Sequence, residues 1–390
     1  MDSVEPSPTW RFHYYVIGGR TARPPPRLPP FDQGGRFTVS MNRINAAPLR
    51  VKIFSWIILG ALSVFFAEVL SGSSPFPWFT IWGLFVTFPL YGLHAIVLAF
   101  LVFRPGRRIT LPALFLAGMI FGMYEAYITK VLFDPTWGAQ SLTLGGLYVF
   151  QTVVLVLFWH PFMAFIAPLL ATECLITESR EIPDALPPFL RGTSKSRARA
   201  VLSSGVAAVL LVPTAAINAP TPLRALESIL SSIIVISVLW GLWRLLLRGK
   251  GYALRDLLPN PRQAAWLGGA LLCLYLVLGF IIRRGSLPKT LGPHVTVAVI
   301  YAVLAGLLFL VLRWGAIEGL PTEKPDRAVP WPGLAVFCVI IVTGAAIVAS
   351  FKAADTVAVL VSWAIGCCAG LSLLGLGVVR VLRNALRRTS

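Results

Sequence analysis

Five ionisable side chains lie within or at the edge of long apolar segments in the first half of the sequence: Glu68, His94, Glu125, Lys130 and His160. A charged side chain at the centre of a membrane helix costs about 2.5 to 3.5 kcal/mol on insertion scales. Such residues usually face a bundle interior or a water-filled cavity, and they mark ion or substrate pathways. We therefore predict that these five residues bind a substrate or an ion. Glu125 and His160 can exchange protons if they lie close together.

The spacing around Glu125 suits contact with another helix. Gly118, Gly122, Glu125 and Thr129 recur at intervals of four, three and four residues, so they form one stripe on an α-helix. The two glycines make a GxxxG pattern, which lets a neighbouring helix approach closely. The other candidates within apolar segments lie on comparable faces that include small residues. These faces therefore suit helix contact better than lipid contact.

Three prolines lie inside the same apolar segments. A proline within an α-helix leaves the carbonyl four residues earlier without its donor. In a membrane such a carbonyl needs another partner. Here the prolines are Pro89, Pro161 and Pro168, and the freed carbonyls would be those of Phe85, Leu157 and Ala164.

Each candidate residue also has a purely structural interpretation. Glu125 could pair with a His or Lys only to fix helix register, because buried charges can specify packing. His94 could be a neutral, hydrogen-bonded residue, while Glu68 and Lys130 could reach the interface by snorkelling. The sequence leaves both interpretations open for each residue.

The composition indicates a polytopic membrane protein. The 390 residues are 56% hydrophobic and 13% charged, against about 25% charged in a soluble domain. The net charge of +18 lies in short clusters between apolar segments and not on one basic face, so we predict no nucleic-acid partner. The five cysteines form no CxxC pair, which indicates neither a disulfide framework nor a zinc site.

Ten segments are long and apolar enough to cross a bilayer, which takes about 20 residues of α-helix. They are Ile53–Leu70, Pro77–Phe103, Leu111–Phe133, Leu144–Leu170, Ala200–Ile217, Leu226–Leu247, Ala265–Ile282, Val295–Leu312, Pro332–Ser350 and Thr356–Val381. Residues 1–50 differ, because they are rich in Pro and Arg and contain no apolar run suited to a signal peptide. We predict a disordered basic cytoplasmic tail there, in which Met41 is an alternative start.

The distribution of Lys and Arg orients these spans. With the N-terminus inside, 28 of the 34 Lys and Arg residues fall on the cytoplasmic side and 6 outside, in agreement with the positive-inside rule. We therefore predict an all-α integral membrane protein, a polytopic bundle of about ten transmembrane helices with both termini inside, in the cytoplasmic membrane of a prokaryote. In this orientation His160 lies near the midplane, and Glu125 and Glu68 lie further out. Lys130 reaches the outer interface.

The chain divides into parts of unlike polarity. Residues 51–176 are predicted to form a four-helix module that holds the polar site. Residues 200–381 form a six-helix module whose spans contain almost no ionisable groups, which suits a scaffold or a partner-binding half. A cytoplasmic loop at 177–199 joins the two modules, and 382–390 form a basic cytoplasmic tail.

Known catalytic and cofactor motifs do not occur in the sequence. HExxH, GxSxG, a Walker A loop and an Asp-rich prenyltransferase box are missing, so we predict no cofactor and no metal, and whether the protein is an enzyme stays open. The order Glu, His, Glu, His over four helices resembles intramembrane metalloproteases of the CAAX-processing type. That family begins with adjacent glutamates, whereas Ala126 follows Glu125 here, so the metal interpretation is weak.

Four motifs resemble those of a family of uncharacterised prokaryotic multi-pass membrane proteins. They are AEVLSGSSP (67–75), PLYG (89–92), GMYEAY (122–127) and LFDPTWG (132–138). That family pairs an outer SGSTP-like loop with a glutamate-bearing helix that ends in a (D/N)P turn. The resemblance covers the first three spans and departs from the family where relatives often have two consecutive glutamates. It implies a common site and brings no known activity.

These observations favour a transporter or permease-type protein with a polar site that opens to the outer face. The alternatives are a membrane-embedded enzyme acting on a lipid or membrane peptide, and a structural or assembly subunit. The expected partners are the lipid bilayer and a small-molecule, ion or lipid substrate. The sequence specifies neither the substrate nor the oligomeric state.

The charge distribution predicts that both termini are cytoplasmic. A tag at either end should react with a membrane-impermeant reagent only after the cells are permeabilised. A terminus that reacts in intact cells would show that the predicted number of spans is wrong.

Overall fold

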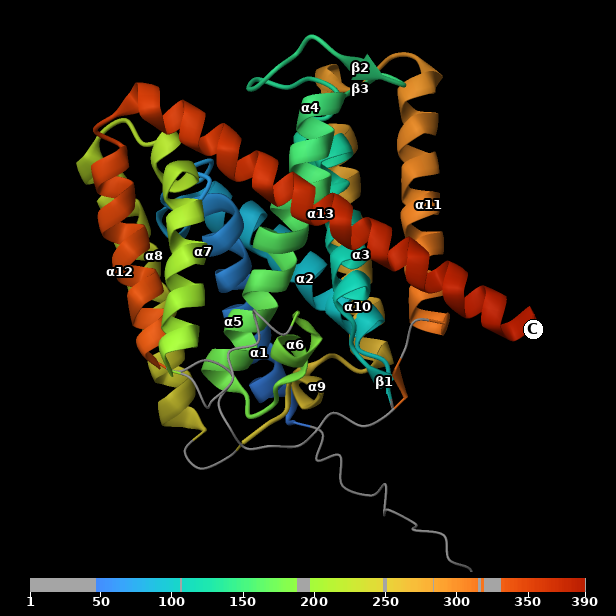
Figure 1. Cartoon of the computed structure of the whole chain (residues 1–390), viewed down its shortest axis with the longest axis horizontal. Helices are drawn as coiled ribbons and strands as arrows, with labels where there is room; N and C mark the ends of the chain where they lie inside the picture. The colour runs from blue at the N-terminus through green and yellow to red at the C-terminus, as the bar shows by residue number, and fades with distance from the viewer. Residues whose placement is uncertain are drawn as a thin grey trace, which may run out of the picture. The chain divides into compact units, whose positions relative to one another are not determined.

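The computed structural model describes residues 47–105, 107–187, 197–247, 251–282, 284–314, 317–318 and 331–389. Most of the predicted N-terminal tail, residues 1–46, lies outside the described residues. The chain from Asn45 to Ser390 forms one compact unit. Figure 1 shows that its helices run through the unit in both directions, with α13 crossing the others obliquely.

The first four predicted spans are helices that change type along their length. In chain order they are α1 (Leu49–Val64) with η1 (Phe65–Val69), η3 (Gly83–Thr87) with α2 (Phe88–Val102), α3 (Leu111–Gly122) with η4 (Glu125–Thr129), and α4 (Val149–Thr152) with η5 (Val153–Ile166) and α5 (Ala167–Ile176). The short 3-10 helix η2 (Pro77–Phe79) precedes the second span. A two-residue hairpin of β2 (Thr143–Leu144) and β3 (Leu147–Tyr148) precedes the fourth, with Thr143 opposite Tyr148.

The later spans are more regular. They are α7 (Arg197–Ile217), α8 (Pro222–Leu246), α10 (Pro261–Leu276) with η6 (Val277–Ile281), α11 (Leu291–Trp314), α12 (Trp331–Val348) and α13 (Lys352–Thr389). Short elements join them: α6 (Glu181–Ala185), α9 (Leu254–Leu257), the 3-10 helix η7 (Arg284–Ser286), and the strands β1 (Arg107–Arg108) and β4 (Ile317–Glu318). Arg107 pairs with Glu318 in the antiparallel β1–β4 pair. The predicted tail at 382–390 continues α13, which is helical to Thr389.

The helical multi-pass class is confirmed. Among the described residues, eight helices are long and apolar enough to cross a membrane, and Val201–Ile217 and Pro332–Val348 are shorter apolar helices. All ten predicted segments are therefore largely helical, and eight of them meet the length of a candidate span.

The predicted α-helices are replaced by π-helix where three of the polar residues lie. Glu68 lies in η1, Glu125 in η4 and His160 in η5. A π-helix bonds each N–H to the carbonyl five residues back, is rare, and occurs frequently at functional sites. The 3.6-residue period used above therefore does not hold across these turns.

The glycine stripe of the third span packs against another helix, as the sequence predicts, and the structure shows that this helix is the fourth span. A Cβ atom added at Gly118 would lie 2.4 Å from the Cα atom of Pro161. A Cβ atom added at Gly122 would lie 3.0 Å from the Leu155 carbonyl oxygen and 3.2 Å from the His160 Cβ atom. The two glycines therefore allow η5, and His160 with it, to lie directly against α3.

The two predicted modules pack together extensively. Helix α10 packs on α2, α11 packs on α3, and α13 packs on η5 and α3. Helices α7, α8 and α12 form a neighbouring group, visible on one side of Figure 1. The helices that carry the polar residues thus have neighbours from the second half of the chain.

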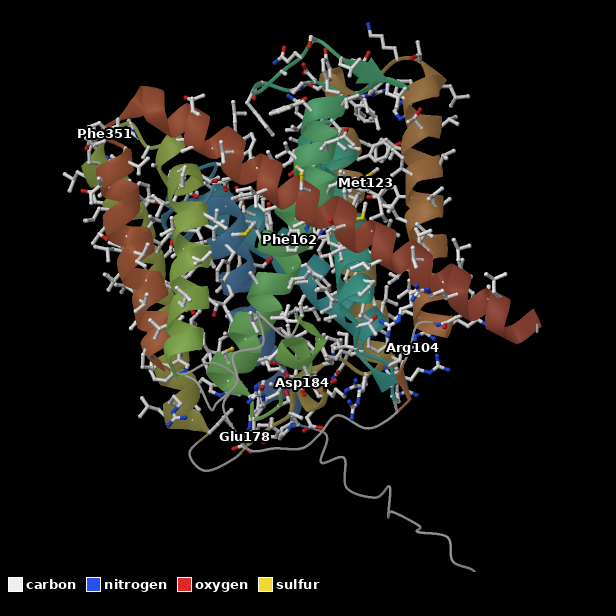
Figure 2. The ribbon with its side chains drawn as sticks, in the orientation of Figure 1. Arg104, Met123, Phe162, Glu178, Asp184 and Phe351 are labelled. Atoms are coloured by element: carbon white, nitrogen blue, oxygen red, sulfur yellow. The ribbon has the colours of Figure 1, made fainter. Side chains whose placement is uncertain are left out.

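Arg255 joins several segments at the end of the unit where Figure 2 labels Arg104, Glu178 and Asp184. Its guanidinium group bonds the Glu181 carboxylate at 2.6 to 2.7 Å and donates to the carbonyls of Arg104 and Arg107 at 2.5 and 2.7 Å. Figure 2 shows Phe351 at the opposite end. The sequence predicts that the Arg255 end is cytoplasmic.

The Gly118 contact predicts a matched pair of variants. Gly118→Ala should destabilise the protein by about 1 to 3 kcal/mol, because the methyl group would overlap the Pro161 backbone. Gly268→Ala in α10 is the control, since nothing lies within 4 Å of its added Cβ atom. Thermal unfolding in detergent measures both, and an equal melting temperature for the two variants would contradict the close α3–η5 packing.

Candidate functional site

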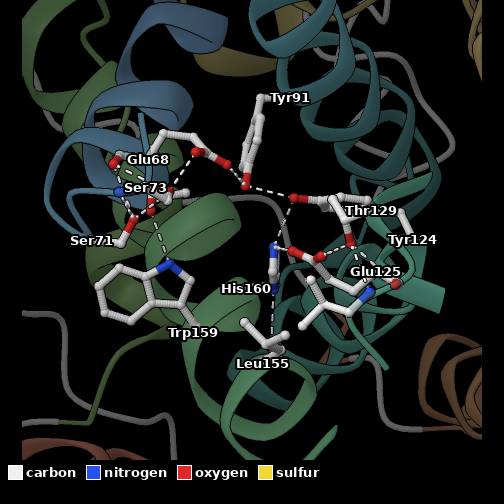
Figure 3. Close-up of polar contacts among 12 residues, drawn as sticks. Glu68, Ser71, Ser73, Tyr91, Tyr124, Glu125, Thr129, Leu155, Trp159 and His160 are labelled. Carbon is white, nitrogen blue, oxygen red and sulfur yellow. Dashed lines mark hydrogen bonds and ion pairs between the residues drawn. The ribbon is translucent and has the colours of Figure 1, made fainter. Parts of the chain in front are cut away.

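Five buried or half-buried side chains from four spans form one line of polar contacts, which we call the Glu68–Glu125 chain (Figure 3). The Tyr91 hydroxyl donates to Glu68 Oε1 at 2.5 Å and lies 2.7 Å from the Tyr124 hydroxyl. The Tyr124 hydroxyl lies 3.2 Å from His160 Nε2. His160 Nε2 in turn lies 3.2 Å from Glu125 Oε1. The chain therefore joins the two glutamates through two hydroxyls and one imidazole.

Hydroxyl groups bind both ends of this chain. The Ser73 hydroxyl donates to Glu68 Oε2 at 2.6 Å, and Ser71 donates to the Glu68 carbonyl at 3.0 Å. At the other end the Thr129 hydroxyl bonds Glu125 Oε2. Ser73 is exposed, so the chain reaches the protein surface through the loop that follows the first span.

The centre of the chain is shielded from solvent. Glu125 is 6% exposed, and the Tyr91, Tyr124 and His160 side chains are 2% exposed or less. A polar group buried in this way costs free energy unless it is hydrogen-bonded. The direct contacts of the Glu68–Glu125 chain meet that requirement.

A backbone carbonyl of the same span contacts the His160 ring. Nδ1 of His160 lies 3.1 Å from the Leu155 carbonyl oxygen, five residues back. The sequence indicates only that the Leu157 carbonyl, freed by Pro161, lies within a turn of His160. The π-helical turn η5 changes the register, so Leu155 supplies the acceptor.

One carbonyl freed by a proline has the predicted kind of partner. The Ser63 hydroxyl of α1 donates to the Ala164 carbonyl at 2.6 Å. Nearby, the Trp159 indole N–H donates to the Ala67 carbonyl at 2.9 Å. These two bonds hold the first and fourth spans together beside Glu68 and His160.

His94 lies next to the Glu68–Glu125 chain but bonds other groups. Its Nδ1 lies 2.8 Å from the Leu90 carbonyl, and its Nε2 lies 3.0 Å from the Tyr275 hydroxyl of α10. Tyr275 in turn lies 3.3 Å from the Tyr301 hydroxyl of α11. The His94 ring packs beside Tyr124, with centroids 5.4 Å apart. His94 thus connects the neighbourhood of the chain to the second half of the protein.

Lys130 is buried and binds backbone carbonyls of another span. Its Nζ atom donates to the Leu278 carbonyl at 2.8 Å and to the Ile282 carbonyl at 2.7 Å, at the end of η6. The Lys130 backbone is left-handed, with φ 65°, where η4 ends. A cation at a helix C-terminus is favourable because the terminal carbonyls are negative. Of the five predicted site residues, Glu68, Glu125 and His160 converge, while His94 and Lys130 bind neighbouring groups.

The sequence prediction missed the two tyrosines that complete the chain. Tyr91 lies in the polar stripe of the second span, which also carries His94, so a signal for it existed. Tyr124 directly precedes Glu125, and adjacent residues of an α-helix point roughly 100° apart. Both side chains nevertheless contact His160 Nε2, at the point where η4 begins.

Buried carboxylates at the Arg255 end have a structural role. Glu173 accepts bonds from the backbone N–H groups of Glu181 and Ile182, both at 2.7 Å, and from Ser179 at 2.6 Å. These contacts stabilise the start of α6.

Among the described residues, no three His, Cys, Asp or Glu side chains converge to hold a metal ion. The chemistry open to the Glu68–Glu125 chain is acid–base chemistry, because its members all carry or accept protons.

A protein-family model described as "Uncharacterized membrane protein family" matches residues 57–388. The chain belongs to this family. An uncharacterized protein from Archaeoglobus fulgidus is 36% identical over 276 residues, which cover 71% of this chain and 80% of the relative. No solved structure matches the chain. The family match extends well beyond the first three spans, on which the resemblance noted in the sequence rests.

The contacts of Glu125 predict different outcomes for two substitutions. Glu125→Gln keeps the side-chain size and hydrogen bonding, so it should insert and fold normally. Glu125→Leu leaves the Thr129 hydroxyl and His160 Nε2 without this partner, which should cost about 1 to 3 kcal/mol. Expression level and thermal unfolding measure both variants. Equal stability of the Leu variant and the unsubstituted protein would contradict the contacts described.

Proposed function

We propose that this membrane protein is a transporter of the permease type and that the Glu68–Glu125 chain is its site. The observation that carries the proposal is the continuous line of polar contacts from exposed Ser73 to buried Glu125. Intramembrane ionisable groups that pair with one another characterise ion and substrate pathways. Three members of this chain lie in π-helical turns, which are frequent at functional sites.

The proposal includes ten spans, with both termini in the cytoplasm of a prokaryotic cell. The shorter apolar helices Val201–Ile217 and Pro332–Val348 belong to α7 and α12, which pack against each other. A helix somewhat shorter than the hydrocarbon thickness can still span the membrane, because the bilayer thins locally. The positive-inside distribution requires an even number of spans between the two basic ends. The archaeal relative agrees with a prokaryotic membrane.

In this orientation the site opens outward. Ser71 and Ser73 lie in the short loop after the first span, on the side opposite the basic clusters. A solute that reaches this loop meets the Glu68 carboxylate first, because Ser73 is exposed and Glu68 is half-buried. Glu125 lies at the far end of the Glu68–Glu125 chain, beyond the two tyrosine hydroxyls and the His160 ring.

A second function, membrane-embedded catalysis on a lipid or membrane peptide, is favoured by one observation. The Glu68–Glu125 chain reaches the protein surface through Ser73 at one end, while Glu125 at the other end is 6% exposed. Access from a single face suits an acid–base site for a substrate in the outer leaflet. A histidine paired with a carboxylate is a common general acid–base unit.

Solute-induced currents distinguish these functions. The full chain in liposomes on a solid-supported membrane should give currents with one class in a panel of organic acids, amino acids and sugars. Glu125→Gln should abolish the current, while Glu227→Gln should retain it, because Glu227 forms an exposed pair with Arg224. Loss of the current in both variants, or no current with any solute, would overturn the transporter proposal. Release of lipid or peptide fragments from the same liposomes, lost only in Glu125→Gln, would establish the enzyme instead.

A further inference from the structure

We infer that the ion handled by this site is the proton, with one proton shared between Glu125 and His160 and passed to Glu68 through the hydroxyls of Tyr124 and Tyr91. The inference rests on the proposed function, since it names the ion for that same site. It decides between the two roles open to a Glu–His pair, which are sharing a proton and binding a cation.

The backbone contact of His160 fixes where its first proton lies. Nδ1 lies 3.1 Å from the Leu155 carbonyl oxygen, which can only accept a hydrogen bond. Nδ1 therefore carries a hydrogen in every charge state that keeps this bond. In a neutral ring Nε2 then has a lone pair, and in a charged ring it has a hydrogen.

The contact between Nε2 and Glu125 consequently contains one proton. Nε2 lies 3.2 Å from Glu125 Oε1, and two lone pairs at that distance would repel each other. Either the carboxylic acid donates to neutral His160, or the imidazolium donates to the carboxylate. The second carboxylate oxygen, Oε2, accepts from Thr129. Both nitrogens of His160 and both oxygens of Glu125 are therefore engaged by protein groups, which favours a shared proton over a bound cation.

The two tyrosines can carry this proton to Glu68 in one concerted shift. The Nε2 proton of the imidazolium passes to the Tyr124 oxygen, at 3.2 Å, while the Tyr124 hydroxyl proton passes to the Tyr91 oxygen, at 2.7 Å. The Tyr91 hydroxyl proton passes to Glu68 Oε1, at 2.5 Å. His160 becomes neutral and its Nε2 atom accepts from the Tyr124 hydroxyl, Glu68 becomes a carboxylic acid, and each tyrosine ends with one proton. The Glu125 carboxylate keeps its Thr129 bond and moves away from Nε2 until a proton returns to the pair. The net charge does not change, and no redox partner is needed.

The same path runs in reverse when a proton arrives from the Ser73 side. Glu68 is half-buried and bonded to exposed Ser73, so its carboxyl group can exchange protons with the outer solution. Apart from the members of the Glu68–Glu125 chain, the described titratable groups beside it include His94, next to the Tyr124 ring, and Tyr275, bonded to His94. These two lie off the path, so Tyr275 provides a matched control for the relay tyrosines.

Infrared difference spectroscopy of the full chain in liposomes tests the relay without requiring a transported solute. A step in external pH should change the carbonyl stretching band of a protonated carboxyl group that Glu125→Gln removes. Tyr124→Phe and Tyr91→Phe keep the rings but remove the relay hydroxyls, so the response of that band should slow at least about tenfold. Tyr275→Phe should respond at the rate of the unsubstituted protein.

Two outcomes would overturn the inference. One is an unchanged rate in both Tyr124→Phe and Tyr91→Phe. The other is a shift of the same band when Na⁺ replaces K⁺ at constant pH, which would make the pair a cation site. The infrared response and the solute current can also disagree. If the relay responds as expected but the liposomes give no solute current, the inference is supported and the transporter proposal is overturned. The failure of one proposal is therefore distinguishable from the failure of the other.

Discussion

Hydrocarbon offers no hydrogen-bond partner, so an ionisable group inside a span is costly unless the protein itself supplies a partner. The contact of His160 Nε2 with both Glu125 and Tyr124, at 3.2 Å each, shows how the protein meets this constraint. The close approach of η5 to α3 depends on glycine at 118 and 122. Without that approach Glu125 would lack this partner. The polar site and the packing of the third and fourth spans are therefore one structural feature.

The π-helical turns are the local means by which the residues converge. Glu68, Glu125 and His160 come from three different spans, and each lies where the helix widens. A π-turn frees backbone groups and rotates the following side chains relative to an α-helix. In η5 this rotation brings the Leu155 carbonyl to His160, and that contact fixes the protonated nitrogen of the ring. Backbone geometry thereby constrains the proton chemistry of the side chain.

The second half of the chain supports this site. Its spans lack ionisable pairs of the Glu–His kind among their described residues, yet Tyr275 and Tyr301 form hydrogen bonds that lead to His94. Lys130 binds the carbonyls at the end of η6, so the helix that carries Glu125 is joined to the span formed by α10 and η6. This contact fixes the end of η4 against η6. The predicted division into a polar module and an apolar module describes composition, while the contacts cross between the two.

The sequence alone determined the helical membrane class, the positions of the apolar helices, and the candidates Glu68, Glu125 and His160. It could do so because apolar length, charge distribution and the cost of buried ionisable groups are local properties of a chain. The glycine stripe also identified the face of the third span that contacts a neighbouring helix. Only the tertiary structure decided that Tyr91 and Tyr124 link the two glutamates and that His94 and Lys130 bind elsewhere. These outcomes depend on π-helical register and on contacts between distant spans, and neither follows from a 3.6-residue period.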